Sequence, residues 1–375
     1  MLQNNRNASY TMLILAIETS CDETGMSLLQ ASGGVTKPKF KVIENFVSSQ
    51  IKIHAPFGGV VPNLAKREHL KNLPILLKRV MSHESRVPPK ARLAKGGMSQ
   101  VDLIAVTVGP GLEPALWTGI NFAQKLSDAY KIPIVGANHL EGHLYSFLLP
   151  KKRFMIHESR VKTVFPAIAL IVSGGHTILL NMKSFSRWKR LGETRDDAAG
   201  EAFDKVARLL ELPYPGGKEI EKIANRGNAN SIVFPRPMMH DNSPAGAYDF
   251  SFSGLKTSVL YYIKNNPNFN KADVAASFQK AAFDVLVWKT IKAAREYGAC
   301  SILLSGGVAA NKLLRKRMKY ESKKFGLNFF VPHFTYNLDN AAMIGVTAYF
   351  KAQKGEFTKA VTIDRYPNLK LGLDN

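Results

Sequence analysis

Two pairs of apolar runs, each pair separated by a short polar turn, mark the hydrophobic pattern of the chain. The run over residues 13–17 ends in a polar segment, and apolar character resumes over 26–29. The run over 167–172 likewise ends in a turn, and apolar character resumes over 178–180. Because an apolar run, a polar glycine-containing turn and a second apolar run are typical of two paired strands, each pair predicts a β-hairpin.

A strand, a glycine turn and a helix are predicted after each hairpin. In the first half the pattern gives a strand over 101–108 and a helix-like segment over 112–125. In the second half it gives a strand over 301–304 and a helix-like segment over 308–319. Since both halves share this order at a long period, the sequence predicts a duplicated α/β lobe rather than a solenoid.

The length of 375 residues exceeds the range over which a single hydrophobic core grows, so two lobes are expected. The charged stretch 150–162 lies between apolar segments and is the predicted boundary. We therefore expect an N-terminal lobe over 1–160 and a C-terminal lobe over 161–375. An amphipathic helix near 339–353, capped by Asp339 or Asn340, is expected to belong to the second lobe and to return to the cleft.

The charge balance points to a polyanionic partner. Lys and Arg number 51 against 29 Asp and Glu, which gives a net charge of +22. Such a surplus favours nucleic acid or an anionic membrane, and the plainer alternative is a compartment in which basic proteins are common. Basic clusters at 151–153, 187–190 and 315–317 are candidate RNA contacts, and the alternative for each is a solvated surface.

The two cysteines, Cys21 and Cys300, lie far apart, so the chain has neither a zinc spacing nor a disulfide framework. No run approaches 18 consecutive apolar residues, so no segment is expected to span a membrane. A membrane is not among the expected partners. The first residues lack the Arg-rich amphipathic pattern of a transit peptide, so a presequence is expected to be absent from this chain.

A pair of histidines is the candidate metal site. His139 and His143 are four residues apart, so on a helix both imidazoles lie on one side. That spacing suits a transition metal such as zinc or iron, and the alternative is two unrelated helical histidines. Glu141 lies roughly 200° around a helix from each histidine, so it points away and cannot act as the general base of a zinc protease.

The glycine turns are candidate phosphate sites. Exposed amides in the turns at 173–177 and 305–307 can bind anions, and two hairpins facing across a cleft hold nucleotide phosphates in actin-like ATPases. The alternative for any one turn is ordinary hairpin chemistry. Asp204 and Glu221 could accept hydrogen bonds from ribose hydroxyls, or could be surface acids. The aromatic-rich segment 250–257 is either part of a site or core packing.

Eight motifs, taken together and in order, resemble the universal tRNA threonylcarbamoyladenosine transferase family, formerly labelled O-sialoglycoprotein endopeptidase. The resemblance covers nearly the whole chain and is most similar to the single-subunit mitochondrial branch. It implies an actin-like two-lobe α/β fold with duplicated lobes. The motifs are residues 17–24, 58–62, 139–143, 172–177, 200–204, 252–257, 305–311 and 339–343.

The resemblance also implies an acyl-transfer reaction. Threonylcarbamoyl-adenylate would donate its threonylcarbamoyl group to the exocyclic amine of the adenosine 3′ of the anticodon, in tRNAs reading codons that begin with A, and AMP would leave. One divalent metal ion per subunit, zinc or iron, would be the cofactor. The metal would join the two lobes, with two ligands from the first and one from the second. A nearby metal would stabilise negative charge that develops on the carbonyl.

Residue roles follow from the same resemblance. His139, His143 and Asp339 would ligate the metal. Asp22 and Glu23 would lie near the reacting carbonyl, and Asp22 is the candidate general base. The residues that would hold the nucleotide are Ser173, Gly174, Gly175, His176, Thr177, Asp204, Gly217, Glu221, Ser305, Gly306 and Asn311.

The expected partners are tRNA, a threonylcarbamoyl-adenylate synthase that supplies the substrate, and a second copy of the chain in a homodimer. The net charge of +22 and the family branch imply the mitochondrial matrix. Two other functions stay open: a metalloprotease, as the older family label says, and a non-enzymatic actin-like nucleotide switch that scaffolds partners.

Overall fold

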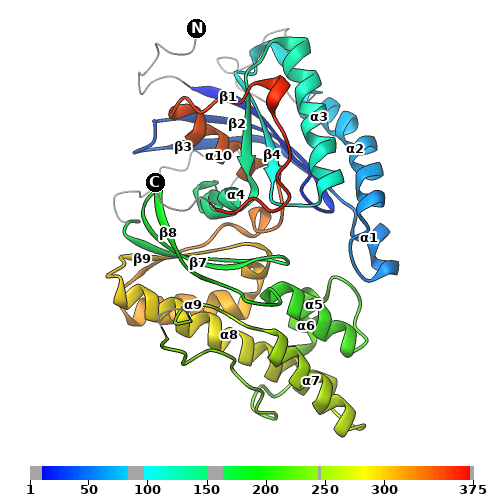
Figure 1. Cartoon of the computed structure of the whole chain (residues 1–375), viewed down its shortest axis with the longest axis vertical. Helices are drawn as coiled ribbons and strands as arrows, with labels where there is room; N and C mark the ends of the chain where they lie inside the picture. Colours follow the sequence, from blue (N-terminus) through cyan, green and yellow to red (C-terminus); the bar gives the residue numbers. More distant parts are fainter. Residues whose placement is uncertain (1–10, 83–96, 151–163, 244–245, 372–375) are drawn as a thin grey trace. The chain divides into compact units, whose positions relative to one another are not determined.

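The computed structural model describes residues 11–82, 97–150, 164–243 and 246–371, and these form two compact α/β units (Figure 1). The first unit contains the described residues up to 54, those from 60 to 150, and 332–371; the second contains 55–59 and those from 164 to 331. Of the predicted boundary segment, only Pro150 lies within the described residues.

The first unit is built on a five-stranded sheet of order β3-β2-β1-β4-β5. Its strands are β1 (Met12–Glu18), β2 (Glu23–Ser32), β3 (Lys39–Ser49), β4 (Leu103–Gly109) and β5 (Ile134–Asn138). Its helices are α1 (Ile51–His54), α2 (Pro62–Ser82), α3 (Glu113–Tyr130), α4 (His139–Tyr145) and α10 (Ala341–Gln353).

The second unit is built on a sheet of order β10-β9-β6-β7-β8. Its strands are β6 (Ala167–Val172), β7 (Thr177–Ser184), β8 (Arg187–Glu193), β9 (Ser301–Ser305) and β10 (Asn328–Phe330). Its helices are α5 (Ala199–Leu209), α6 (Gly216–Ala224), α7 (Ser253–Asn265), α8 (Lys271–Glu296) and α9 (Lys312–Lys324).

The two sheets have the same topology. Counted within each unit, the strand order is third, second, first, fourth, fifth, with the first three strands antiparallel and the last two parallel to the first. Both predicted hairpins and both strand–turn–helix segments are present, so the predicted duplication is confirmed. The helix predicted from residue 308 starts later, because a 3-10 turn over Gly307–Ala310 comes first and Asn311 then caps α9.

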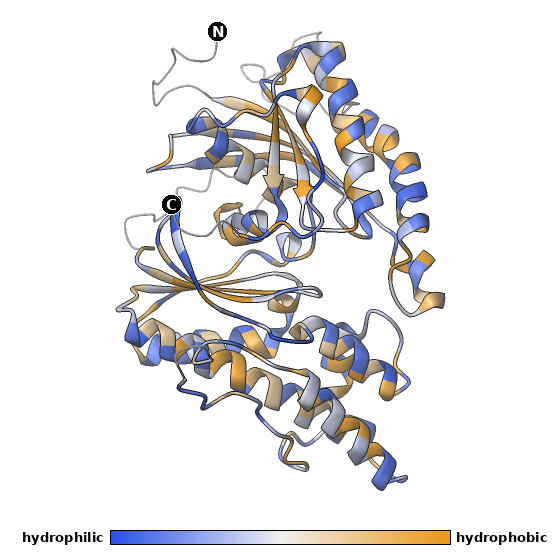
Figure 2. Cartoon of the chain, viewed as in Figure 1, coloured by the Kyte–Doolittle hydropathy of each residue, from blue (hydrophilic) through white to orange (hydrophobic). Residues whose placement is uncertain are grey.

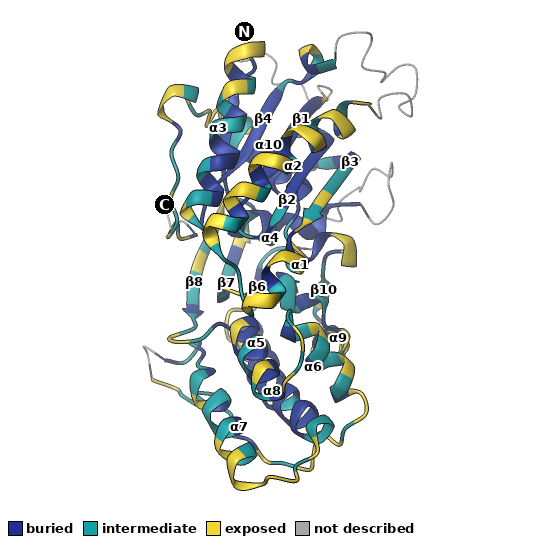
Figure 3. Ribbon diagram, turned by 90° about the vertical axis from the view of Figure 1, so that its right-hand side faces the viewer, coloured by how far each residue is buried: buried dark blue, intermediate teal, exposed yellow. Residues whose placement is uncertain are grey.

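Alternate residues of β1 face opposite sides of the first sheet. Leu13, Leu15 and Ile17 pack into one hydrophobic cluster with residues of α2 and α3. The other face is covered by α10, where Gly345 lies against Ala16. Figure 2 shows hydrophobic residues along the central strands and mixed faces on α2 and α3. The sheet is therefore closed on both faces, and Figure 3 shows its centre as buried.

Two predictions about the C-terminal helix are wrong. Every residue of α10 from Ala341 to Phe350 is buried, so the helix is enclosed all round rather than amphipathic, because β1, β2, β5 and α4 all pack against it. Residues 332–371 also belong to the first unit and not to the predicted lobe over 161–375. The chain returns to the first unit because α10 fills the face of the sheet that α2 and α3 leave uncovered.

The contact between α4 and α10 depends on a glycine. A Cβ atom at Gly142 would lie 2.9 Å from Cγ of Met343 and 3.1 Å from Cδ1 of Ile344. Both distances are shorter than ordinary carbon contacts, so only a residue without a side chain lets the two helices approach this closely. Gly142 therefore fixes the distance between α4 and the N-terminal turn of α10.

Replacing Gly142 tests this close approach. We expect Gly142→Val to lower the free energy of unfolding by roughly 1–3 kcal/mol, because the added methyl groups overpack the contact with Met343. Denaturant unfolding followed by circular dichroism measures it. Gly254→Val in α7 is the matched control, because the Cβ there would meet only Pro237 at 3.8 Å. Equal loss of stability in both variants would show that the contact is not a constraint.

Candidate functional site

Two histidines lie on one side of α4. The helix begins where β5 ends, and the Asn138 side chain caps it by accepting a hydrogen bond from the Leu140 amide at 2.8 Å. His139 thus occupies the first helical position and His143 lies one turn further, with ring centroids 4.7 Å apart. The predicted shared face is present, and both side chains are buried.

Asp339 completes a cluster with these histidines. Its Oδ1 lies 3.5 Å from Nε2 of His139 and 3.2 Å from Nε2 of His143. The ligand atoms of the three residues all lie within 4.8 Å of one another. All three residues belong to the first unit, so the expectation that Asp339 comes from the second lobe is wrong. Asp339 reaches the histidines because it directly precedes Asn340, the cap of α10.

The distances in this cluster fit a bound divalent cation. Zinc binds imidazole nitrogen and carboxylate oxygen at about 2.0–2.2 Å, so neighbouring ligands of a tetrahedral ion are roughly 3.4 Å apart. The two nitrogen–oxygen distances, 3.2 and 3.5 Å, bracket that value. Two imidazoles and one carboxylate suit zinc and ferrous iron alike. Three protein ligands also leave a position for substrate, as in catalytic metal sites.

The surroundings of His143 support the same interpretation. Its side chain is 1% exposed, and among the described residues neither ring nitrogen has a hydrogen-bond partner. Buried polar atoms without partners are costly, and a bound cation would satisfy Nε2. Asp339 is near but offers no hydrogen bond of acceptable geometry to this ring.

A buried carboxylate, Glu18, holds the ring of His139 from behind. Its Oε2 lies 3.2 Å from Nδ1 of His139, and the Thr107 hydroxyl donates to the same oxygen at 2.6 Å. The Ser20 amide donates to Oε1 at 2.6 Å. A proton on Nδ1 that is shared with Glu18 leaves Nε2 free to bind a metal, which is how carboxylates orient metal-binding histidines.

The attraction between His139 and Glu18 determines the pKa values of both groups. Burial opposes ionisation of both groups, yet Asp339 and Glu18 raise the pKa of His139 to about 9. Against the same burial, the charge and hydrogen bond of His139 hold the pKa of Glu18 below its usual value. His139 and Glu18 therefore form a buried ion pair. Because Asp339 is also near, two carboxylates face one imidazolium.

Asp22 lies in the turn between β1 and β2, and Glu23 begins β2. Asp22 is 8% exposed and its carbonyl accepts a hydrogen bond from the Gln50 amide at 2.9 Å. Burial, together with the charges of Asp339 and Asp22, raises the pKa of Glu23 to about 10. The same causes, burial first, raise the pKa of the Cys21 thiol well above its usual value. Glu23 thus lies within the electrostatic field of Asp339, and Asp22 is its direct neighbour in the chain.

Residues that hold this loop were not predicted from sequence. His69 of α2 bonds the Thr24 hydroxyl through Nδ1 at 2.8 Å and the Cys21 carbonyl through Nε2 at 2.9 Å. Gln50 contacts the same ring, and His54 contacts Gln50 in turn. The signal in the sequence was weak, since a single histidine on an amphipathic helix resembles many packed histidines.

Glu141 points away from the metal cluster, as predicted. Burial raises its pKa, and the opposing attraction comes from Lys351 and Lys354 near the C-terminal end of α10. Asp339 precedes the opposite end of that helix. A carboxyl at that position cannot activate a water bound beside His139 and His143, as a zinc protease requires.

The second unit holds the predicted nucleotide residues. In the β6–β7 turn the Ser173 amide donates to the His176 carbonyl at 2.8 Å, and the His176 amide donates to the Ser173 hydroxyl at 3.2 Å. Gly174 and Gly175 at its tip are exposed, and a Cβ at either would meet nothing within 4 Å. The tip is therefore an open stretch of backbone that a phosphate could approach.

The polar side chains of this set already have structural partners. The Thr177 hydroxyl accepts from the Ala199 amide at the start of α5. Asp204 accepts from the Gly216 and Gly217 amides at the start of α6. Each side chain thereby satisfies a free amide at a helix N-terminus.

Two further residues of the predicted nucleotide set, Glu221 and Asn311, make hydrogen bonds at the start of α9. Glu221 accepts from the Lys312 amide at 2.8 Å. Asn311 caps the helix, and its Nδ2 donates to Gln279 at 2.7 Å. At Gly306, with φ +91°, a Cβ would lie 2.3 Å from the Val172 carbonyl oxygen, so this turn packs directly on β6. Ser305, which ends β9, is buried.

These contacts join the nucleotide set into one continuous region of the second unit. The start of α5 touches the hairpin, since a Cβ at Gly200 would lie 2.6 Å from the Ser173 carbonyl oxygen. Asp204 links α5 to α6, and Glu221 links α6 to α9. The starts of three helices therefore lie along one chain of contacts, an arrangement that favours anions wherever an amide stays free.

Other sequence candidates have different environments. Phe250 and Phe252 are fully buried in the core of the second unit, so the aromatic segment packs the core. In the cluster 315–317, Arg317 pairs with Asp284 and Arg315 donates to the Ala309 carbonyl. The cluster 151–153 lies outside the described residues.

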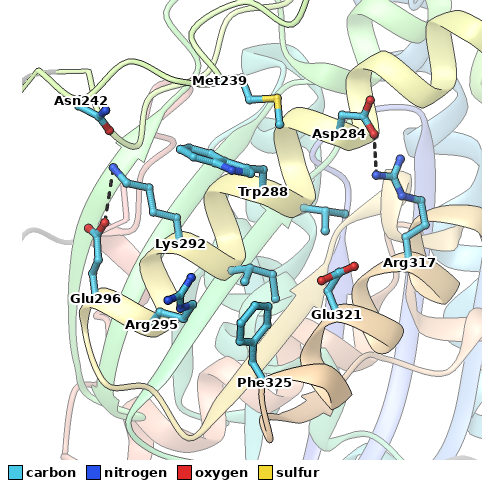
Figure 4. A pocket seen from close by; sticks show the side chains of 12 residues that line it. Met239, Asn242, Asp284, Trp288, Lys292, Arg295, Glu296, Arg317, Glu321 and Phe325 are labelled. Atoms are coloured by element: carbon cyan, nitrogen blue, oxygen red, sulfur yellow. Dashed lines mark hydrogen bonds and ion pairs between the residues drawn. The ribbon is translucent and has the colours of Figure 1, made fainter.

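A hollow of about 680 Å³ lies between α8 and α9 on the second unit (Figure 4). Its lining charges are largely matched, since Arg317 pairs with Asp284 and Lys292 with Glu296. The predicted metal and nucleotide residues do not line it. We therefore assign it no part in the site.

Comparison with known proteins identifies the family. A family described as tRNA N6-adenosine threonylcarbamoyltransferase matches residues 41–346. Proteins of that name from Thermosipho africanus and Clostridium novyi are 45% and 43% identical, each over 96% of this chain and over 100% and 98% of their own length. No helix among the described residues is long and apolar enough to cross a membrane.

Solved structures support the fold. HypF from T. kodakarensis aligns over 92% of this chain with a TM-score of 0.56 and 15% identity, and a full-length HypF aligns over 93% with the same score and 12% identity. This chain spans about half the length of each, 48% and 47%. At an identity this low the structural match is evidence for the fold alone. Together with the duplicated sheets, the match confirms the predicted two-lobe actin-like fold.

The role of Glu18 in orienting His139 can be tested by an isosteric change. We expect Glu18→Gln to weaken metal affinity about tenfold or more, because the ring of His139 loses its charged partner. Competition with a chromophoric chelator measures the affinity, and the absorption spectrum of a Co²⁺-loaded sample reports the geometry. Thr118→Val, which removes a buried hydroxyl bonded to the Pro114 carbonyl in α3, is the control. Unchanged affinity and spectrum in Glu18→Gln would contradict the role.

The open hairpin tip gives a second test. Gly175→Val places a branched side chain where a phosphate would approach, and the empty space around this position leaves the fold intact. We expect weaker binding of adenine nucleotide by calorimetry, with unchanged thermal unfolding. A folded variant that binds nucleotide as tightly as the parent would exclude this turn as the phosphate site.

Proposed function

We propose, because this chain belongs to the tRNA N6-adenosine threonylcarbamoyltransferase family, that it carries out the full transfer reaction on tRNA. The substrate would be threonylcarbamoyl-adenylate, and the acceptor the exocyclic amine of the adenosine 3′ of the anticodon, in tRNAs reading codons that begin with A. The observation that carries the proposal is the cluster of His139, His143 and Asp339, in a chain matched to the family over residues 41–346.

The proposed reaction is an acyl transfer. The amine nitrogen forms a bond to the carbamoyl carbon, the bond from that carbon to the phosphate oxygen breaks, AMP leaves with the electron pair, and the amine gives up one proton. A divalent ion held by the three ligands would stabilise negative charge on the carbonyl oxygen. Asp22, buried beside the cluster, is the candidate acceptor of the proton. Its neighbour in the chain, Glu23, lies close enough to Asp339 for that charge to raise its pKa, which supports the assignment of this segment to the site.

Binding of the leaving AMP is assigned to the second unit. The exposed amides at Gly174 and Gly175 would bind its phosphate, and free amides in a turn are well suited to a group whose negative charge grows as the bond breaks. Asp204 and Glu221 would contact the ribose hydroxyls from the starts of α6 and α9, which their carboxylates hold. The two tasks, metal binding and nucleotide binding, thus fall to different units.

Partners and location are further parts of the proposal. A threonylcarbamoyl-adenylate synthase would supply the substrate, and the enzyme would act as a homodimer. The net charge of +22 supports a mitochondrial matrix location, although the relatives named above are bacterial and speak for the type of enzyme rather than for a compartment. The metal would be zinc or iron.

A metalloprotease is the main alternative, and a scaffolding nucleotide switch is the second. The orientation of Glu141 toward Lys351 and Lys354 opposes the protease, because it leaves no general base beside the histidines. A pure scaffold would not need a ligand set with an open coordination position.

Reconstitution tests the proposal. With purified synthase, threonine, bicarbonate, ATP and tRNA, we expect the parent protein to form threonylcarbamoyladenosine, read out by nucleoside mass spectrometry. The double variant His139→Ala, His143→Ala should lose bound metal and at least about 100-fold of the transfer rate, because two of three ligands are gone.

Glu141→Gln is the matched control on the same helix. Glutamine keeps the shape of the Glu141 side chain, and this residue lies by the lysines at the end of α10 opposite Asp339, so transfer should stay at the parent rate. A protease would show the reverse, with peptide cleavage that a chelator and Glu141→Gln both abolish. Full metal content and full transfer in the double histidine variant would overturn the proposed site.

A further inference from the structure

Helix α9 carries a row of exposed lysines. Lys312, Lys316, Lys319 and Lys323 are all exposed, whereas Leu314 and Met318 of the same helix are buried in the core of the second unit. At about 100° per residue the four lysines fall within roughly 60° of arc, and at 1.5 Å per residue they extend over about 16 Å. We call these four residues the lysine face of α9.

Within α9 the lysine face is not balanced by acids, and at its start Glu221 of α6 accepts a hydrogen bond from the Lys312 amide. Glu321 lies on the opposite side of the helix, about 180° from Lys312, where Figure 4 shows it beside Arg317 at the hollow between α8 and α9. Among the described residues, no ion pair involves Lys312, Lys316, Lys319 or Lys323. By contrast, Arg315 and Arg317 contact groups of the second unit, the Ala309 carbonyl and the Asp284 carboxylate.

This arrangement costs α9 stability. Lys312 and Lys316, and Lys319 and Lys323, are like charges four residues apart, and each such pair destabilises a helix by a few tenths of a kcal/mol. Lys312 also lies at the positive end of the helix dipole, where Glu221 offsets part of the cost of a cation. An anionic partner would relieve this repulsion.

From this we propose that the lysine face of α9 binds the phosphate backbone of tRNA, an inference that rests on the proposed function. Each lysine is a flexible point charge of the kind that contacts phosphates without reading sequence. Tyr320, 68% exposed at the edge of the face, could stack on an unpaired base. The face also begins next to Asn311, so it starts at the region assigned to the nucleotide.

An anionic membrane fits the same helix less well. Helices that lie on membranes insert a broad apolar side into the bilayer. The apolar side of α9 is already used, because Leu314 and Met318 pack into the core. The lysine face therefore offers charge without the apolar surface that membrane insertion requires.

The test reverses three charges of the face in the full-length protein. The variant Lys316→Glu, Lys319→Glu, Lys323→Glu spares Lys312, whose amide contacts Glu221. We expect tRNA affinity to fall at least about tenfold and the slope of log affinity against log salt to become shallower by about two to three, because about three phosphate contacts are lost. Fluorescence anisotropy of labelled tRNA over a range of salt concentrations measures both.

The control carries the same change in net charge elsewhere on the second unit. Lys222, Arg226 and Lys264 are exposed outside α9, and their reversal to Glu should leave affinity and salt slope near those of the parent. Equal losses in both variants would show that net charge, not this face, governs binding, and would overturn the inference. AMP affinity and thermal unfolding should match the parent in both, which separates loss of the RNA surface from misfolding.

The remaining outcomes keep this inference distinct from the proposed function. If the parent binds tRNA and forms the modified nucleoside while the α9 variant binds as the parent does, the lysine face is wrong and the function stands. If the parent forms no modified nucleoside, the function fails independently of the binding data. Loss of binding to phosphatidylserine vesicles, with tRNA affinity unchanged, would overturn the inference in favour of a membrane.

Discussion

The packing of α10 against the first sheet is the constraint on which the candidate metal centre depends. The helix is buried all round, and it reaches its place after the chain has completed the second unit. Because Asn340 caps the helix, the preceding residue Asp339 is fixed at its N-terminal end. The absence of a side chain at Gly142 lets α4 come close enough for His143 to meet that carboxylate. The same packing of α10 therefore covers the sheet and brings the three metal ligands together.

Electrostatics gives the cluster its chemical character. Glu18, Glu23 and Asp339 influence one another's charge around a single imidazolium, His139. Burial makes this excess of acid costly, and Glu23 responds with a pKa of about 10. A divalent cation would offset the excess more fully than one protonated ring can. The acids that surround the histidines thus favour a bound metal in addition to the ligand atoms themselves.

The sequence predicted those features that depend on residues close together in the chain, and it failed where distant segments pack together. The hairpins and the shared face of His139 and His143 depend on local periodicity, and both were predicted correctly. The unit to which Asp339 belongs was predicted wrongly, because it is decided by packing between segments some 200 residues apart. Glu18 falls in the polar segment between the predicted apolar runs 13–17 and 26–29, so the pattern places it in a turn although it ends β1. The available signal was an acidic residue at the end of a strand whose other residues are apolar. Such a carboxylate is buried only where it finds hydrogen-bond donors, and Thr107 is one of them.

The nucleotide region shows how one residue can serve both fold and site. Asp204 and Glu221 each give a carboxylate oxygen to amides at a helix N-terminus, which offsets the positive end of that helix. The β6–β7 turn differs, because its exposed tip at Gly174 and Gly175 has no side chains to fill the space above the backbone. Anion affinity in this unit should then concentrate at the turn, while the two acids hold the starts of α6 and α9. Under the proposed function, this distribution of charge would place the phosphate of AMP at the turn and its ribose beside the acid-capped helices.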